Sequence, residues 1–174
     1  MGVVTSLGET VDDFWSNLIA GKSGVCAISI FDATEFDSRI GGECAAFKPE
    51  SYFDRKAAKR LDRFSQFAVV SARQAIAQAG LGADDYAGDR RRLGCIIGSG
   101  IGGILEFEQQ YLRLIEKGPD KVSAFTIPKL MINAAAGTIA IENGLKGISS
   151  TVGTACASAC HAMRDAYDAV RTNR

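Results

Sequence analysis

Two short extended segments, each followed by a turn of small residues and then a helical pattern, constrain the fold of this chain most strongly. Residues 93–97 form a continuous apolar run, typical of a strand covered on both faces, and lead through a glycine-rich turn into a helix at about 104–116. Residues 149–154 precede a second helix, expected at about 157–171. Because strands that alternate with helices build layered sheets, the sequence predicts an α/β fold.

The rest of the chain adds helices and turns but no linker or repeat. The expected elements, in chain order, are a helix that follows a capping box at Thr10 and Asp13 and ends at Gly21, a turn-rich stretch over 25–47, exposed helical turns over 48–63, a helix over 62–79 stopped by Gly80, and a helix from Pro128 to about Asn143.

Length and charge bound the kind of protein. The 174 residues suit one domain with a real core, and the 20 basic residues balance the 20 acidic ones. Zero net charge argues against bulk binding to nucleic acid or to a membrane surface. No apolar run approaches the roughly 18 residues that span a bilayer, and no signal peptide is visible. We therefore expect a cytoplasmic protein.

The five cysteines and the single histidine argue against structural disulfide bonds and against a metal site. The five cysteines are odd in number and show no C-x-x-C pair, which predicts reduced thiols; they are Cys26, Cys44, Cys95, Cys156 and Cys160. With His161 as the single histidine, a zinc cluster is not expected. The sequence predicts neither a metal nor a cofactor.

The glycine-rich turn at 98–103 fits the pattern G-x-G-x-x-G between a strand and a helix, the context of a dinucleotide site. Against that interpretation, the strand is not the first of its unit, and Asp120, which has roughly the offset of a ribose-binding acid, lies beside Pro119 in a loop. The alternative is that the glycines let the backbone pack tightly against a substrate or another helix.

Cys156 lies in the turn between a strand and a helix. Free N–H groups and the positive end of the helix dipole favour a thiolate there and can face an oxyanion. The alternative is a buried small apolar side chain, and the local pattern leaves both open. Cys160, one turn further, is expected in the core, and His161, about 140° round the helix from Cys156, is expected to be structural.

Taken together, seven stretches resemble the condensing enzymes of the thiolase superfamily, and most closely the ketoacyl synthases of type II fatty-acid synthesis. In chain order they are Gly-Val-Val-Thr-Ser-Leu-Gly at 2–8, Phe-Asp at 31–32, Asp-Arg-Phe at 62–64, the glycine-rich turn at 98–103, Gly-Pro at 118–119, Asn-Ala-Ala-Ala-Gly at 133–137 and Thr-Ala-Cys-Ala-Ser at 154–158. Each stretch alone is weak, but their order along the chain is specific.

The resemblance implies that Cys156 accepts an acyl group from acyl carrier protein and that its N–H supplies half of an oxyanion hole. Ile101, with Gly100 and Gly102, would line the acyl pocket. The segment at about 125–133 would lie near the interface of a homodimer. For three basic residues the resemblance implies docking of the acidic carrier, whereas a solvated face is the equally simple alternative; they are Lys56, Lys59 and Arg60.

The family also needs two histidines from its second half for decarboxylation of malonyl-carrier, and this sequence, which ends at Arg174, has neither. We therefore expect residues 1–174 to form an incomplete amino-terminal ketoacyl synthase domain, a thiolase-like half that is truncated at both ends, with exposed strand edges and at most acylation of Cys156. The alternatives are a non-catalytic interaction or dimerisation module and, ranked last, a dinucleotide-binding domain.

Overall fold

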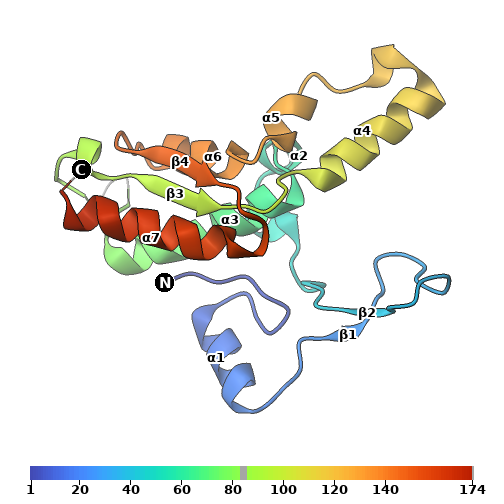
Figure 1. The fold of residues 1–174 in the computed structure, drawn as a ribbon, viewed down its shortest axis with the longest axis horizontal. Coiled ribbons are helices and arrows are strands. Elements are labelled where there is room, and N and C mark those ends of the chain that lie inside the picture. Colours follow the sequence, from blue (N-terminus) through green and yellow to red (C-terminus); the bar gives the residue numbers. More distant parts are fainter. Residues whose placement is uncertain (83–85, 174) are drawn as a thin grey trace.

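A two-stranded parallel sheet with helices on both faces forms the centre of the computed structural model, which describes residues 1–82 and 86–173 (Figure 1). Strand β3 (Cys95–Gly98) pairs in register with β4 (Ser149–Val152). Helix α7 (Ser158–Arg171) covers one face, and α6 (Ala134–Glu142) packs on the other. The predicted α/β class is confirmed; Arg174 lies outside the described residues.

The remaining elements surround this centre or extend from it (Figure 1). They are α1 (Val11–Ile19), β1 (Cys26–Ala27), β2 (Ile40–Gly41), α2 (Arg55–Arg60), α3 (Arg63–Ala79), α4 (Ile104–Lys117) and α5 (Thr126–Leu130), with single 3₁₀ turns at Pro49–Ser51, Arg90–Arg92, Pro119–Lys121 and Ala155–Ala157. Strands β1 and β2 form a short antiparallel pair within the predicted turn-rich stretch.

Helix α3 carries the core of the structure. Its Val69 and Val70 pack with Ile139 of α6 and with Phe47 and Phe53 from the chain before it, and all five side chains are buried. Burial of an aliphatic or aromatic side chain contributes about 1.5–3 kcal/mol. The contact between α3 and α6 therefore anchors the layer behind the sheet.

The predicted helix ends agree with the structure where local caps set them. The Thr10 hydroxyl accepts a hydrogen bond from Asp13 N at 3.1 Å and donates one to the Asp13 carboxylate at 2.7 Å, and α1 begins directly after it. The Asp62 carboxylate caps α3 by accepting from Phe64 N at 3.2 Å. Gly80, at a φ of +63°, ends α3 in the left-handed conformation that glycine adopts readily.

The single helix predicted from Pro128 to about Asn143 is wrong, because two helices with a break at residues 131–133 replace it. In a continuous helix the Leu130 carbonyl would accept from Ala134 N. Instead it accepts from Gly103 N at 3.0 Å, while Ala134 N donates to Met131 O at 3.0 Å. A contact with the glycine-rich turn has therefore displaced a helical hydrogen bond.

The strand bounds differ from prediction by two residues. Leu93 closes the 3₁₀ turn before β3 through a bond from its N–H to Arg90 O at 3.1 Å, so the strand begins at Cys95 rather than at 93. The four residues of β3 are half-buried. Within the described part of the chain β3 and β4 pair only with each other, so each has an open edge, as expected.

The prediction that Cys160 lies in the core is also wrong, because Cys160 is exposed. The buried residues of α7 are Ser158 and Ala162, which therefore define the side that faces the sheet. Cys160 is two positions from each and lies about 200° round the helix from them, on the opposite side.

Among residues 1–82 and 86–173, no helix has the length and apolar character needed to cross a bilayer.

Candidate functional site

The parallel sheet brings the glycine-rich turn and the Cys156 turn together. Because β3 and β4 run in the same direction, the turns that follow them, 98–103 and 153–157, leave the same edge. A β-carbon added at Gly100 would lie 3.6 Å from the carbonyl oxygen of Ala155, the residue before Cys156. Ligands in open α/β sheets bind at this edge, beyond the carboxyl ends of the strands.

The Cys156 turn is held by its own hydrogen bonds. The buried Ser158 hydroxyl accepts from Thr154 N at 2.9 Å and donates to Ala155 O at 2.7 Å. Ala155 has a φ of +49°, a left-handed conformation that is costly for a residue with a side chain and that clusters at functional sites. Cys156 is exposed in the 3₁₀ turn that runs directly into α7, and no side chain caps that helix.

His161 is exposed on α7, and its ring nitrogen Nδ1 lies 2.8 Å from the Thr154 hydroxyl, with which it shares a hydrogen bond. This contact ties the first turns of α7 to the end of β4. It agrees with the expected structural role of His161, which stays a prediction.

The glycines of the turn are needed for close packing. A β-carbon at Gly98 would lie 2.5 Å from the Ser158 backbone, at Gly102 2.7 Å from Leu130 O, and at Gly103 2.5 Å from Lys129 O. Gly102 also has a φ of +73°. The backbones of α5 and α7 therefore lie directly against these glycines, which favours the packing interpretation of the turn.

Ile101 stands between these packed glycines with 64% of its surface exposed. The Ser99 hydroxyl accepts a hydrogen bond from Gly102 N at 3.1 Å, which closes the turn around it. Ile101 is thus an exposed apolar residue on the turn next to the Cys156 turn, and its role in lining an acyl pocket stays a prediction.

A buried polar network lies at the start of α4, directly after the glycine-rich turn, and sequence reasoning missed it. The second oxygen of Asp62 accepts from Glu106 N at 2.8 Å, so Asp62 caps both α3 and α4. The Glu106 carboxylate, 2% exposed, accepts from Gln110 Nε2 at 2.9 Å and forms an ion pair with Lys129 of α5. Nothing in the local sequence marks Glu106 and Gln110, rather than the apolar residues of α4, as the side chains that this helix buries.

The basic residues of α2 face further cations across a cavity. Lys56, Lys59 and Arg60 line a cavity of about 580 Å³ together with Arg113 of α4 and Lys129 of α5, two cations that the sequence analysis did not single out. Asp54 begins α2: the N–H groups of Ala57 and Lys56 hold the pKa of its carboxyl below the ordinary value, and the charges of Lys56 and Arg60 act in the same direction.

Comparison with known proteins decides the family. The whole sequence, residues 1–174, matches the family described as "Beta-ketoacyl synthase, N-terminal domain". The chain belongs to the β-ketoacyl synthase family. Among curated relatives of this ketoacyl synthase chain, the 3-oxoacyl-[acyl-carrier-protein] synthase 2 of Synechocystis sp. is 40% identical over 171 residues, covering 98% of the chain and 41% of the relative. That of Coxiella burnetii is 43% identical over 161 residues, covering 92% and 38%.

Solved structures agree with this fold. The ishigamide ketosynthase/chain length factor superposes with a TM-score of 0.83 at 26% identity, covering 99% of the chain and 43% of that protein. A β-ketoacyl synthase from Burkholderia phymatum gives 0.80 at 27%, covering 98% and 42%. A type II PKS acyl-carrier protein in complex with its ketosynthase gives 0.76 at 20%, with 98% and 45% covered, and shows the fold alone. The ketoacyl synthase chain thus spans about two fifths of its relatives' length.

The thiols of this ketoacyl synthase chain are expected to differ in reactivity, with Cys156 alkylated first. Burial raises the pKa of Cys95, and burial, opposed by the Arg63 charge, raises that of Cys44, so both hold less thiolate at neutral pH. Cys26 is exposed in β1, away from a helix N-terminus, whereas Cys160 is exposed within the first turn of α7, after the turn that carries Cys156. Peptide mass mapping after brief iodoacetamide treatment across pH 6–10 checks this order.

In that experiment the labelling of Cys44 and Cys95 should rise only at a pH above the ordinary range of a free thiol. Faster labelling of either one than of Cys156 at pH 7 would contradict activation by the turn.

In residues 1–82 and 86–173 no group of three or more His, Cys, Asp or Glu side chains is placed to hold a metal ion.

Proposed function

We propose that residues 1–174 act as one amino-terminal ketoacyl synthase unit in which Cys156 accepts an acyl group from acyl carrier protein. The observation that supports this most directly is the closeness of Gly100 to Ala155, because it brings the turn that carries Ile101 against the turn that carries Cys156. Membership of the family and the strained backbone at Ala155 point to the same place.

The proposed step is a thioester exchange. The Cys156 thiolate attacks the carbonyl carbon of the acyl thioester, the carbon–sulfur bond to the carrier breaks, and the carrier thiol leaves with a proton. The N–H of Cys156 would stabilise the intermediate oxyanion, an interaction for which one donor is typically worth about 10²–10³ in rate. The test is an intact-mass measurement after incubation with acyl-carrier, with the acyl group located on the Cys156 peptide.

The condensation that follows in the family is proposed only for a protein of the relatives' full length. It uses a carbanion from decarboxylated malonyl-carrier and needs acid–base assistance worth about 10²–10⁴ in rate. The chain has one histidine, His161, which contacts Thr154. We therefore assign acylation, and no ketoacyl product, to the 174-residue chain by itself.

Ile101→Phe is expected to reduce acylation by long acyl groups at least tenfold and to leave short ones nearly unchanged. The added ring fills space beside the thiol without touching the hydrogen bonds that hold the Cys156 turn. Acylation rates with C4 and C12 acyl-carriers check this. Ile101→Val, which removes volume at the same position, is the matched control and should not discriminate against the long chain; an unchanged preference in Ile101→Phe would make the turn merely structural.

We further propose that the acidic carrier docks on the cations of α2. Lys56, Lys59 and Arg60 are exposed on one short helix, and Arg113 and Lys129 enlarge the positive surface. Complementary charge of this kind raises association rates and depends on salt. The curated relatives at 40% and 43% identity are named 3-oxoacyl-[acyl-carrier-protein] synthase 2, which supports a carrier as partner.

A second candidate function is an interaction or homodimerisation module, and exposed apolar faces favour it. Trp15 and Ile19 of α1, Ile115 of α4, and Met163 and Tyr167 of α7 each expose more than half of their surface. Exposed apolar residues at helical spacing mark contact surfaces. Acylation of Cys156 discriminates between the two functions: the acyl-accepting unit is expected to become acylated at Cys156, and a purely structural module is not.

A further inference from the structure

Two adjoining cavities lie between α2 and the helices α4, α5 and α6. One, of about 470 Å³, opens between α2, α5 and α6, and the other is the cationic cavity of about 580 Å³ described above. They share four lining residues, Lys56, Arg60, Phe125 and Lys129, so they form two parts of one cleft. Each volume falls in the range of small-molecule sites, about 300–1,000 Å³.

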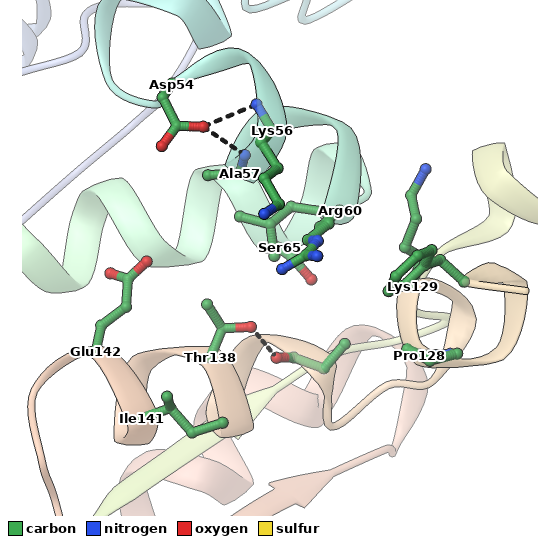
Figure 2. Close-up of a pocket in the computed structure, with 13 residues that line it drawn as sticks. Asp54, Lys56, Ala57, Arg60, Ser65, Pro128, Lys129, Thr138, Ile141 and Glu142 are labelled. Atoms are coloured by element: carbon green, nitrogen blue, oxygen red, sulfur yellow. Dashed lines mark hydrogen bonds between the residues drawn. The ribbon is translucent and has the colours of Figure 1, made fainter.

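The first part of the cleft is mainly apolar. Figure 2 shows Lys56 and Arg60 of α2 across the space from Thr138 and Ile141 of α6, with Ser65 between them. Its apolar lining consists of Ala57, Leu61, Phe125, Pro128, Ala134 and Ile141. The buried Ser65 hydroxyl also lines it and has no hydrogen-bond partner in the part of the chain that the structure describes. A buried polar group without a hydrogen-bond partner is destabilising, and a ligand oxygen can supply the missing partner.

The acidic residues around the cleft are already engaged. Asp54 accepts from the N-terminal N–H groups of α2, Glu142 forms an ion pair with Arg73 at 3.0 Å, and the buried Glu106 pairs with Lys129. Four cations of the cleft form no salt bridge within residues 1–82 and 86–173; they are Lys56, Lys59, Arg60 and Arg113. The part of the cleft lined by Lys59 and Arg113 has five cations and one carboxylate, Glu106, so this end carries an excess of positive charge.

The boundary between the two parts is a cation–π pair. The Arg60 guanidinium lies over the Phe125 ring, 5.3 Å from its centroid, with Phe125 lining both parts. An apolar chain in the first part would thus place its polar end beside the Arg60 charge. We propose that this cleft binds a single-chain anionic amphiphile, with its tail in the apolar part and a carboxylate or phosphate head on the cations.

The test is calorimetric titration of the chain with four eight-carbon probes below their micelle concentrations at constant ionic strength. Octanoate and octyl phosphate should bind, while octanol and octyltrimethylammonium should bind at least tenfold more weakly, because they lack the negative head. The anion that binds more tightly distinguishes a free carboxylic acid from a phosphate monoester as the source. Equal affinity for octanol and for both anions, or no binding of either anion, overturns the proposal.

Variants locate the site. The double variant Lys56→Gln/Arg60→Gln should weaken octanoate binding at least tenfold, because ionised hydrogen-bond donors are the strong ones. Ala57→Leu, which narrows the apolar part, should weaken octanoate more than acetate. The matched control Lys22→Gln/Lys117→Gln removes the same charge from residues that line neither part and should leave the affinity unchanged.

Unchanged octanoate affinity in the Lys56→Gln/Arg60→Gln variant would place any binding elsewhere and reject the cleft. The four-probe titration of the unmodified chain stands by itself if a variant fails to fold. Repeating it with Cys156→Ala should give the same affinities, because binding requires neither the thiol nor a carrier. A failure of acyl transfer and a failure of this site are therefore distinguishable.

Discussion

Replacing Cys156 with alanine is expected to lower acyl transfer from acyl-carrier by about 10⁴–10⁶-fold, which in practice abolishes it. The sulfur is the proposed bond-forming atom, and no neighbouring group can take its place in the thioester exchange. The side chain is exposed, so its truncation removes little buried surface. Stability should therefore change by less than about 0.5 kcal/mol, as for most exposed positions.

The measurement is the rate of mass increase on incubation with acyl-carrier, followed by peptide mapping. Cys160→Ala is the matched control, because it removes another exposed thiol four residues further along, in the first turn of α7. That control should retain the rate of the unmodified chain. Acylation of the Cys156→Ala chain at the original rate, or its loss in the Cys160→Ala chain alone, would contradict the assignment of the nucleophile.

Lys129→Met is expected to destabilise the fold by about 3–5 kcal/mol, the usual cost of removing one partner from a buried ion pair. It leaves the Glu106 carboxylate, 2% exposed, with the Gln110 amide as its one remaining side-chain donor among the described residues. Glu106→Gln should cost less, because the Lys129 side chain is 14% exposed and can move its charge toward water. For a chain of this size the Lys129→Met change corresponds to a fall in Tm of about 6–20 °C.

The double variant Glu106→Leu/Lys129→Met should recover most of that loss, because two apolar side chains replace the pair and no charge is left buried. Thermal and urea unfolding followed by circular dichroism provide the values. Glu142→Gln is the control: its ion pair with Arg73 is 40% and 31% exposed, so its loss should cost about 0–1 kcal/mol. A Lys129→Met cost no larger than that of Glu142→Gln would show that the Glu106–Lys129 pair is not effectively buried.

The sequence by itself determined the α/β class, most helix ends, the family and the place of the candidate nucleophile. Thr10, Asp62 and Gly80 set helix ends through bonds or backbone angles within a few residues, so their signals are local. The position of Cys156 between a strand and a helix likewise follows from the period of the flanking residues. Parallel pairing then places its turn beside the glycine-rich one.

Only the tertiary structure decided which hydrogen-bond and ion-pair partners distant segments share, and which side of each helix is buried. The break after α5 exists because Gly103 N takes the Leu130 carbonyl, a contact between residues 27 positions apart that no local propensity encodes. Cys160 is exposed because the sheet contacts the other side of α7. Burial of Glu106 and the gathering of Arg113 and Lys129 opposite α2 depend in the same way on how the helices pack, since a side chain's burial and partners are fixed by its neighbours in space.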